Sequence, residues 1–524
     1  MLRILCLALV AFVGLTPVVT AQIYTLPELG LQNSGACPAL AARERTSKTM
    51  VPLGCLNTSS KTWTLTPGKV TLPAVDQGST GDVSGMSVTV PGENVARTLL
   101  GRLADIPLSV DSFRGGACAG AVDDTCAVQA AIAAASSQKR ELLLPGGTLT
   151  TGAINFPSGV TIRGRGEGVT TLKLKNGTNL SLLTSGNAYS LYGTGSEGGF
   201  FDFSLSDLTL DGNRANNTSG DCLAIYGARF RLRNLTIKQC PDIGLRTEWG
   251  QYGDFPMEAS FNNILIDTTG ANGADLRGPH DSILDNIVIV DAGQKANNTY
   301  SQLSISGFMN GRFSKVHTWH RSTVANRTIY GVYDASGSND FTNSHFEGSL
   351  TAPAYIGGNF SQYSDSVLYY APWGAGSSSI ILAGKNNKVN GTILGSIFMS
   401  GQPPRIGVYQ TNNASGNIVN LMVLGSTIAA IDVSVGDSGY NDYKIRGAQS
   451  TGPGFLGLFA DTSSVDIQMF GATSNSRIAK DASIAPPASS GAACTYGQRA
   501  FDTNFEYRCV SANSWKRAPL STWP

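Results

Sequence analysis

The sequence predicts an all-β protein whose main body is a parallel β-helix, and two observations carry this prediction. The first is a degenerate repeat between about residues 203 and 443, in which a short apolar strand follows a polar anchor residue at intervals of 22–30 residues. Repeats of this length, built from β-branched strands and Gly/Asn turns, are typical of solenoids. The anchors are Asp207, Asn234, Asn263, Asn286, Lys315, Asn343, Asp365, Asn390 and Asn420.

The second observation is the alternation of side chains within each strand. Successive side chains of a strand point to opposite faces, so the first and third residues after an anchor share a face. These positions are apolar in the four clearest repeats, which contain the pairs Leu208/Leu210, Leu235/Ile237, Ile264/Ile266 and Ile287/Ile289. One rung cannot bury this face alone, and we therefore expect the rungs to stack.

The composition agrees with a β-rich, turn-rich body. Charged residues make up only 14% of the chain, Gly occurs 61 times, and the formal net charge is +1. A chain so close to neutrality gives no electrostatic reason to expect nucleic acid or an acidic membrane surface as a partner.

The first 21 residues have the features of a secretory signal peptide. Arg3 gives a basic start, residues 4–13 are apolar, and Ala21 ends a small-residue cleavage site. The apolar run is shorter than the ~20 residues that a spanning helix needs. We expect a mature chain without a membrane span, secreted to the extracellular space, the cell surface or the periplasm.

The mature chain is expected to begin with an irregular, β-rich region over residues 22–100, which is rich in Thr, Gly and Pro. The β-helix follows over residues 101–480. Its one clear helical pattern starts at residue 123, where Asp123 or Asp124 can serve as N-cap and Val128, Ile132 and their Ala neighbours form an apolar stripe.

Residues 481–493 are predicted to be a linker, because they are rich in Pro, Ala and Ser. Residues 494–524 are predicted to form a small β module. A module of about 30 residues has little core, so a disulfide staple makes physical sense. Sugar binding, nucleation of an oligomer and simple capping stay open as its role.

Eight cysteines follow the predicted signal peptide, and they fall into four sequence-local couples. An even number of cysteines in an exported chain predicts disulfides. The spacing does not fix the connectivity, and sequential pairing is the simplest arrangement. It gives Cys37–Cys55, Cys118–Cys126, Cys222–Cys240 and Cys494–Cys509. None of these couples has the CxxC spacing of a zinc site.

The first turns carry a resemblance to a known family. Ser109-Val-Asp, the Asp123-Asp-Thr-x-Ala-x-Gln-Ala-Ala run, Leu144-Pro-Gly-Gly and Val160-Thr-Ile-x-Gly-x-Gly occur in this order. This order resembles the pectate lyase superfamily, which includes pectin-degrading enzymes and phage tailspikes. The resemblance covers residues 95–175 by motif and extends to about 480 by architecture.

The resemblance implies a right-handed β-helix whose open end is capped by the helix, with Asp123 and Asp124 in the cap rather than in a catalytic pair. The signatures of polygalacturonases and the Arg motif of pectate lyases are missing from this sequence, so pectin is not the expected substrate. The tailspike branch has no shared catalytic motif, and no catalytic residue carries over from it. The C-terminal module resembles small modules of phage tail fibres, which makes a homotrimer one option.

The second and fourth residues after each anchor are expected to face outward in two columns. The second-position column is Thr209, Thr236, Leu265, Val288, His317, His345 and Val367; the fourth-position column is Asp211, Lys238, Asp267, Val290, Trp319, Glu347 and Tyr369. Rungs lie about 4.8 Å apart, which would bring His317 and His345 together, with Trp319 and Glu347 beside them.

A second group of polar residues follows the next turn. Alignment of neighbouring repeats places Glu248 over Arg277 and Arg246 over Asp275. Opposite charges on adjacent rungs are often ladder pairs that only keep register. This interpretation and a functional one both stay open.

From these patterns we predict catalytic roles for Glu347, His317, Asp267, Glu248 and Asp254, and substrate-binding roles for Trp319, Arg321, His320, Arg277, His280 and Trp249. Carboxylates and imidazoles transfer protons, and aromatic planes stack on sugar rings. The set therefore predicts a polysaccharide partner. We expect no cofactor and no metal, with calcium held by carboxylates of the groove as an open alternative.

Two reaction types fit these residues. A glycosidase needs two carboxylates, ~5–5.5 Å apart for retention or ~6.5–9.5 Å for inversion. A lyase needs a base and a cation that neutralises a uronate, for which His317 or His320 and Arg321 or Arg277 are available. Because a β-helix does not imply catalysis, a non-catalytic surface adhesin or a tailspike-like structural protein is the alternative.

Overall fold

The computed structural model describes residues 105–521, apart from 187, 195–198, 250–257, 308, 365, 371, 375–376, 396–405, 427, 449–453, 461, 471–474, 481–485 and 495. Before residue 105 it describes only the backbone of seven strands, and only the backbone is described for residues 475–480 and 501. The chain divides into two units, residues 1–107 and 108–524. The predicted signal peptide falls outside the described residues and stays a prediction.

The first unit contains a five-stranded antiparallel sheet, β1-β2-β3-β4-β5, and a two-stranded pair, β6-β7. The strands are β1 (Leu31–Ser34), β2 (Cys37–Arg43), β3 (Met50–Asn57), β4 (Thr62–Leu65), β5 (Val70–Pro73), β6 (Ser87–Val88) and β7 (Arg97–Thr98). Cys37 and Cys55 lie on the neighbouring strands β2 and β3. Their side chains are outside the described residues, so this bridge stays a prediction.

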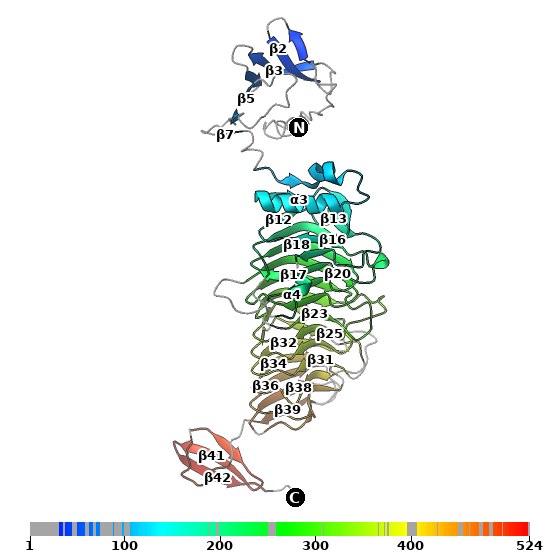
Figure 1. The fold of residues 1–524 in the computed structure, drawn as a ribbon. Helices are drawn as coiled ribbons and strands as arrows, with labels where there is room; N and C mark the ends of the chain where they lie inside the picture. The colour runs from blue at the N-terminus through cyan, green and yellow to red at the C-terminus, as the bar shows by residue number, and fades with distance from the viewer. Residues whose placement is uncertain are drawn as a thin grey trace. The chain divides into compact units, whose positions relative to one another are not determined.

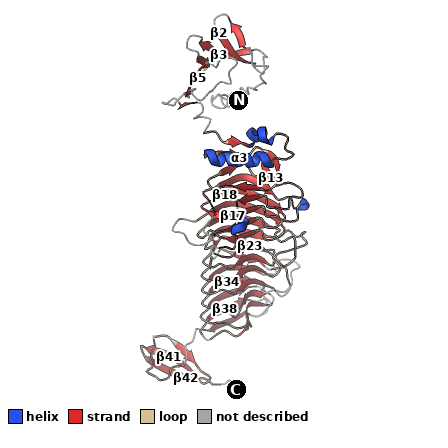
Figure 2. Cartoon of the chain, viewed as in Figure 1, coloured by secondary structure: helices blue, strands red, loops and turns tan. Residues whose placement is uncertain are grey.

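The second unit is built from two long sheets, mostly parallel, whose strands alternate along the chain (Figures 1 and 2). The 19-stranded sheet contains β8 (Leu108–Ser109), β9 (Glu141–Leu143), β10 (Gly147–Thr151), β12 (Thr161–Arg163), β13 (Thr170–Leu174), β16 (Ser204–Asp211), β18 (Arg231–Cys240), β20 (Ser260–Thr269), β22 (Ile283–Val290), β24 (Arg312–Trp319), β26 (Asp340–Thr342), β27 (His345–Phe346), β29 (Gln362–Tyr363), β30 (Leu368–Tyr370), β32 (Lys388–Leu394), β34 (Ile418–Leu424), β36 (Asp442–Ala448), β38 (Ser464–Phe470) and β39 (Asn475–Lys480). The 13-stranded sheet contains β11 (Ile154–Phe156), β14 (Leu183–Ser185), β15 (Phe200–Phe201), β17 (Leu223–Ala228), β19 (Leu245–Glu248), β21 (Ala274–Arg277), β23 (Ser301–Ile305), β25 (Tyr330–Asp334), β28 (Ala352–Ile356), β31 (Ser378–Leu382), β33 (Ile406–Gln410), β35 (Ala429–Val433) and β37 (Phe455–Gly457).

Strands pair with the strand one rung later rather than with their neighbour in sequence. Thus β18 pairs with β20 while β19 pairs with β21, and both pairings are parallel. This is the right-handed parallel β-helix that the repeat and the resemblance predicted.

The anchors of the clearest repeats share a backbone conformation that explains why they are polar. Asp207, Asn234, Asn263 and Asn286 all have positive φ, between 52° and 60°. Asn and Asp tolerate this left-handed region better than other non-glycine residues. The side chains also form a ladder, in which Asn234 donates to Asp207 at 2.7 Å, Asn263 to Asn234 at 3.1 Å and Asn286 to Asn263 at 2.9 Å. Each anchor therefore bends its strand and fixes the register of the next rung.

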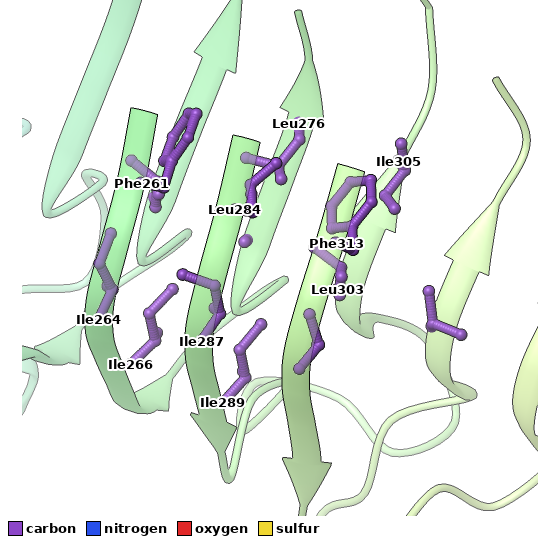
Figure 3. Close-up of a cluster of buried hydrophobic side chains, with 14 of the residues drawn as sticks. Phe261, Ile264, Ile266, Leu276, Leu284, Ile287, Ile289, Leu303, Ile305 and Phe313 are labelled. Atoms are coloured by element: carbon purple, nitrogen blue, oxygen red, sulfur yellow. The ribbon is translucent and has the colours of Figure 1, made fainter. Parts of the chain in front are cut away.

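The apolar residues after the anchors fill the interior of the solenoid. Figure 3 shows Ile264, Ile266, Ile287 and Ile289 stacked from rung to rung. Ile264 is 1% exposed and Ile289 is 0% exposed. The predicted inward register of these rungs is therefore confirmed.

The register prediction is wrong after Glu347. Val367 and Tyr369, expected to face outward, are fully buried, and His345 pairs instead with Leu368. Phe341 and Phe346 are five residues apart, but their partners on the next rung, Tyr363 and Tyr369, are six apart. One extra residue in this corner shifts the outward positions by one, to Leu368 and Tyr370.

The helical pattern forms α3 (Thr125–Gln138), which covers the first rungs. Its buried residues are Ala127, Val128, Ala131, Ile132 and Ala135, as the apolar stripe predicted. The two aspartates before it have different roles. Asp123 accepts a hydrogen bond from the Thr125 N–H at 3.0 Å and forms an ion pair with Lys175. Asp124 occupies the N-cap position, but its side chain accepts a hydrogen bond from the Thr150 N–H at 2.9 Å.

The short helical elements of this unit are η2 (Val110–Phe113), η3 (Gly116–Cys118), α4 (Ala188–Leu191) and η4 (Arg214–Asn216). The part of the chain that the structure describes contains no helix long and apolar enough to cross a membrane.

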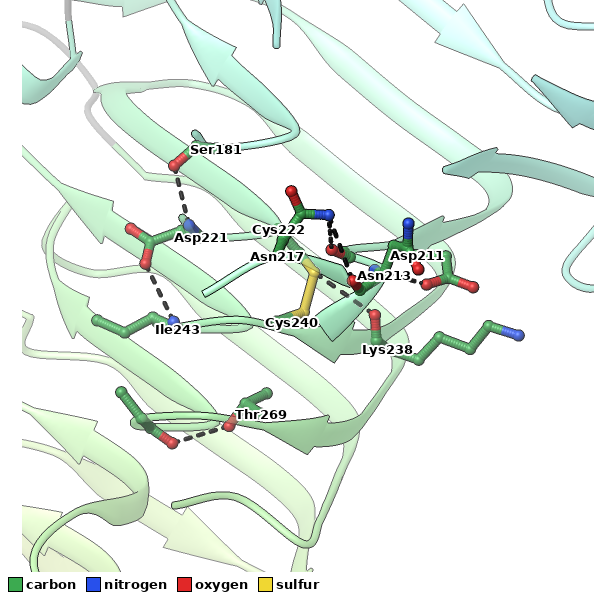
Figure 4. The surroundings of a disulfide bond; sticks show 12 residues. Ser181, Asp211, Asn213, Asn217, Asp221, Cys222, Lys238, Cys240, Ile243 and Thr269 are labelled. Carbon is green, nitrogen blue, oxygen red and sulfur yellow. Dashed lines mark hydrogen bonds between the residues drawn. A yellow bond between two sulfur atoms is a disulfide. The ribbon is translucent and has the colours of Figure 1, made fainter. Parts of the chain in front are cut away.

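Three of the four predicted disulfides are confirmed: Cys118–Cys126, Cys222–Cys240 and Cys494–Cys509. Cys222 and Cys240 are completely buried. Their bridge joins the residue before β17 to the last residue of β18 (Figure 4). Gly212 lies against this bridge, and a Cβ at that position would come within 2.8 Å of Cys222 Sγ.

The C-terminal residues form a three-stranded antiparallel sheet from β40 (Arg499–Phe501), β41 (Phe505–Ser511) and β42 (Ser514–Pro519). Its small core consists of Ala500, Cys509 and Trp515. The Cys494–Cys509 bridge closes this core, as expected for a module of this size.

Candidate functional site

Strand β24 carries the central side chains of the site, and its pairing sets the two outer columns. His317 lies between Val288 of β22 and His345 of β27, and Trp319 pairs with Val290. The rung-to-rung register of the two predicted columns is therefore confirmed up to His345, but two of their members, Thr209 and Val290, are only 2% exposed.

His317 and Glu347 form a hydrogen-bonded pair in these columns. The imidazole Nε2 lies 2.8 Å from Glu347 Oε1, and the side chains are 38% and 24% exposed. The ring of His345 meets His317 edge-on at 5.6 Å between centroids, and the ring of Trp319 lies nearly parallel to it at 6.3 Å. A carboxylate that accepts from one imidazole nitrogen leaves the other nitrogen available as a base.

Two groups beside this pair have shifted pKa values. The pKa of His345 is lowered, mainly because burial disfavours the imidazolium and also because His317 lies close by. The pKa of Tyr370 is raised by burial and by the charge of Glu347. Tyr370 stacks obliquely against His345 at 6.4 Å between centroids. The site thus combines a neutral imidazole and a protonated phenol at neutral pH.

Arg321 binds two carboxylates at one end of the site. Its guanidinium makes two hydrogen bonds to Asp267, at 2.7 and 2.8 Å, and one to Asp291 at 2.5 Å. The bonds to Asp267 are the main cause of the raised pKa of Arg321. The guanidinium also lies 5.8 Å from the ring centre of Trp319. Arg321 is therefore fixed between two carboxylates and held against the indole, and the three side chains together keep one negative charge.

His320 lies inside the corner rather than on the outer face. Its side chain is fully buried, Nε2 accepts the Thr328 N–H at 3.1 Å, and Nδ1 lies 3.5 Å from Asp291. Burial lowers its pKa. The predicted contact of His320 with substrate does not fit this position, because consecutive strand residues point to opposite sides.

The second polar group has the predicted register, with Glu248 opposite Arg277 and Arg246 opposite Asp275. Glu248 is only 7% exposed, its Oε1 accepts the Gly193 N–H at 2.6 Å, and its Oε2 lies 3.8 Å from Arg277. Arg277 also binds Asp275 at 3.1 Å. These contacts fit ladder pairs that keep register better than a catalytic pair.

The structure describes two of the remaining predicted residues of this group, Trp249 and His280. Trp249 is 3% exposed and packs against Phe201 and Tyr226, so the predicted sugar-stacking plane is covered. His280 contacts Asp281 at 2.9 Å. Asp254 falls outside the described residues.

Sequence reasoning missed two residues of the site, Asp291 and Tyr370. Asp291 directly follows the outward position Val290, where a bend lets it reach Arg321; its φ is positive, at 54°. Tyr370 was missed because of the extra residue in the corner before it. A longer gap between inward aromatic residues was the signal that could have revealed the shift.

Within the described ranges, no three His, Cys, Asp or Glu side chains come together in an arrangement that could hold a metal ion. The expectation of no cofactor, with calcium as the alternative, stays a prediction.

Comparison with known proteins bears on the fold and on the function. Residues 110–317 match the family described as "Rhamnogalacturonase A/epimerase, pectate lyase-like". The chain carries a pectate lyase-like β-helix. Of the site, the matched residues contain Asp267, Asp291 and His317, whereas Trp319, Arg321, His345, Glu347 and Tyr370 follow them.

Two relatives of the pectate lyase-like β-helix act on polysaccharides by name. "Depolymerase 1, capsule K8-specific" of Klebsiella phage K5-4 is 29% identical over 183 residues, which are 33% of this chain and 24% of that protein. "Mannuronan C5-epimerase AlgE1" of Azotobacter vinelandii is 33% identical over 199 residues, 35% of this chain and 13% of that protein. The matches span a quarter or less of these relatives.

One solved structure with a similar backbone is the A-module of the mannuronan C-5 epimerase AlgE4 of Azotobacter vinelandii. It is 16% identical, with a TM-score of 0.49, and the match covers 68% of this chain and 99% of that one. The Dettilon tailspike protein follows at 10% identity and a TM-score of 0.47, over 79% of this chain and 78% of that one.

Proposed function

We propose that this chain is an exported enzyme that acts on an acidic polysaccharide by removing a proton from a uronate ring. The hydrogen bond between His317 and Glu347 on the outer face carries this proposal. A depolymerase and a mannuronan epimerase among the relatives support a polysaccharide as the substrate class.

The geometry of the outer face fits an extended glycan. The columns run across successive rungs, spaced about 4.8 Å apart, so a long chain can contact several rungs at once. Trp319 and Tyr370 are both partly exposed and offer aromatic surface to sugar rings. The glycan would contact His317 between these two aromatic residues.

The distribution of charge favours proton abstraction over hydrolysis. A glycosidase of the two-carboxylate type needs two carboxyl groups free to act. At this site Asp267 and Asp291 are both bound by Arg321, whereas Glu347 is hydrogen-bonded to an imidazole. An imidazole oriented by a carboxylate is a general base.

The proposed step uses this base. With Nε2–H donated to Glu347, His317 accepts the proton next to the sugar carboxylate on Nδ1, and the C–H electrons pass into that carboxylate. In a lyase, the bond to the neighbouring glycosidic oxygen then breaks and leaves an unsaturated sugar. In an epimerase, a proton returns to the opposite face. The protonated phenol of Tyr370 is the candidate acid for either outcome.

Arg321 has a different role in this proposal. Its charge is balanced by Asp267 and Asp291, so it does not neutralise the uronate. We assign it to positioning Trp319. Oligomeric state is independent of the chemistry, and a homotrimer of the tailspike kind remains part of the proposal to be tested by size-exclusion chromatography with light scattering.

The test is a screen of the purified chain against polyuronates and neutral polysaccharides. Three readouts separate the reactions: ultraviolet absorbance of unsaturated products for a lyase, new reducing ends without absorbance for a hydrolase, and deuterium uptake from heavy water for an epimerase. Glu347→Gln and His317→Ala should each lower turnover about 100-fold.

Lys385→Gln serves as a control on the same solenoid, since this exposed side chain is outside the site. Hydrolysis products that persist in the His317 variant would contradict the proposed base. Binding of a glycan without any turnover would favour the adhesin or tailspike alternative.

A further inference from the structure

The small C-terminal sheet has one basic face. Arg508 of β41 lies directly opposite Arg499 of β40 and Lys516 of β42. Residues directly opposite each other in antiparallel strands share a face, with Cβ atoms about 4.5–5.5 Å apart. Three cationic side chains therefore form a row across all three strands, which we call the cationic row.

The cationic row faces away from the core of the module. The sequence neighbours of the three cations are Ala500, Cys509 and Trp515, and these are buried. Because neighbouring strand residues point to opposite faces, the core lies on the other face of the sheet. Arg508 and Lys516 are exposed. In the described part of the chain, no carboxylate oxygen lies within 4.0 Å, the limit for an ion pair, of the side-chain nitrogens of Arg508 or Lys516.

This arrangement works against the stability of the sheet. Like charges directly opposite each other in a sheet are destabilising, and a module of this size has little core to offset them. The Cys494–Cys509 bridge supplies part of the missing stability. Local conflicts of this kind tend to occur where a surface has a function.

Positive charge is also concentrated in this part of the sequence. Residues 494–524 contain four basic and two acidic residues, although the whole chain has a formal net charge of only +1. Arg517 pairs with Tyr507 and so lies on the opposite face, where its guanidinium is 4.3 Å from the ring centre of Phe505. The face of the cationic row also carries Glu506, two residues before Arg508, so that three cations share this face with the carboxylate of Glu506.

We propose that the cationic row binds an acidic polysaccharide and acts as a second attachment point, separate from the site around His317. The identity of the polymer rests on the proposed function. A uronate chain has one carboxylate per sugar, so consecutive sugars can meet consecutive cations. Single exposed ion pairs are weak, but a second contact on the same polymer raises its effective concentration at the first.

The experiment measures binding of the full chain to immobilised polymannuronate at low and high salt, with neutral dextran and phosphatidylserine vesicles as comparison surfaces. Arg508→Gln/Lys516→Gln should weaken binding to polymannuronate about tenfold at low salt. It should also reduce the dependence of binding on salt, since screening acts on exposed charges. Lys385→Gln/Lys388→Gln removes the same charge from exposed positions of the solenoid and should leave binding within twofold of the parent.

A second pair of measurements separates this proposal from the proposed function. Turnover of short oligouronates should be unchanged in the Arg508/Lys516 variant, because neither residue belongs to the site around His317. His317→Ala should keep the salt-sensitive binding even if it abolishes turnover. Arg508→Lys should retain the parental affinity, which checks that charge rather than folding is responsible.

Equal losses in the module and solenoid variants would overturn the proposal, as would parental binding in the Arg508/Lys516 variant. Preferential binding of the parent to phosphatidylserine vesicles would replace the polysaccharide with a membrane surface. If no polysaccharide is turned over but the Arg508/Lys516 effect on polymannuronate remains, the proposed function fails and the cationic row stands.

Discussion

The rungs from β16 to β24 and the rungs from β32 to β38 stack in the same parallel register, but different polar ladders connect them. In the first group, Asn234 and Asn263 have positive φ, and the half-buried side chain of Asn263 donates a hydrogen bond to that of Asn234. In the second group, Asn387, Asn417 and Asn441 are buried, and the backbone N–H of each of the first two donates to the side chain of the next. The same stacking is therefore supported from outside in one half and from inside in the other.

The outer faces of the two groups differ as well. Around β24 the columns present His317, Trp319 and a carboxylate-bound Arg321. Around β34 they present Leu394, Met422 and Phe470, the last two about half exposed, and Arg446, which is paired with Asp466 at 2.8 Å. The comparison teaches that stacking dictates the inward residues of the described rungs, while the outward residues differ freely, so that the imidazoles of the outer columns occur only on the described rungs around β24.

The largest expected effect distinguishes the two ladders. Asn417→Ala should lower the free energy of unfolding by about 3 kcal/mol, because it leaves the buried N–H of Asn387 and the carbonyl of Gly384 without partners. Asn263→Gly, which keeps the left-handed backbone accessible, should lower it by less than about 1 kcal/mol, because water replaces its partners. Urea denaturation measures both, and equal losses would show that the ladders are equivalent.

The next effect concerns turnover rather than stability. Once a substrate is found, His317→Ala should reduce the rate about 100-fold, which corresponds to about 2.7 kcal/mol of barrier. Met422→Ala occupies the same column on a rung without proton carriers and should stay within twofold of the parent. Comparable losses in the two variants would mean that chemistry is not confined to the rungs around β24.

A smaller effect tests the packing around the buried bridge of the first group. In Gly212→Ala the new Cβ would lie 2.8 Å from Cys222 Sγ and Cys240 Cα, and overpacking should cost about 2 kcal/mol. Gly115→Ala is the matched control, because no atom lies within 4 Å of its Cβ position. Differential scanning calorimetry should show a lower Tm only for Gly212→Ala.

The smallest effect concerns the cap of the first rungs in acid. Hydrogen bonds from Thr125 and Lys175 lower the pKa of Asp123 to about 2. A carboxylate with a lowered pKa stabilises the fold above its unfolded pKa of about 3.9, and this contribution is lost as the pH falls towards 2.

Asp123→Asn should therefore reduce the free energy of unfolding by about 1 kcal/mol at pH 6, allowing for the exposure of Lys175, and by almost nothing at pH 2. Urea titrations at the two pH values measure this difference. A deficit that persists at pH 2 would mean that the effect is one of shape rather than charge.

The fold could be predicted from the sequence because its rule is local and repeated. The alternation of apolar and polar residues around Ile264 and Ile289 predicted correctly which side chains point inward. Side chains of a strand alternate between its two faces, so a register shifted by one residue would bury the polar ones. The helix cap and three disulfides followed from equally local patterns.

The site could be predicted only in part. His317, Trp319 and Glu347 were correctly predicted to lie together, because counting residues from each anchor gives the observed strand register on their rungs. Trp249 and His320 were misjudged because burial in a corner depends on loops that no repeat encodes. Asp291 was missed because its contact with Arg321 spans 30 residues and needs a bend that the spacing does not reveal.

The extra residue between Tyr363 and Tyr369 has a wider consequence. In most sheets an insertion of one residue would disturb every later pairing of the strand. Here each strand pairs with its equivalents on the adjacent rungs, so the turn absorbs the insertion and Tyr370 replaces Tyr369 on the surface while later rungs resume their order. Such a protein can change its exterior one rung at a time, by insertions and deletions in its turns as readily as by point substitutions.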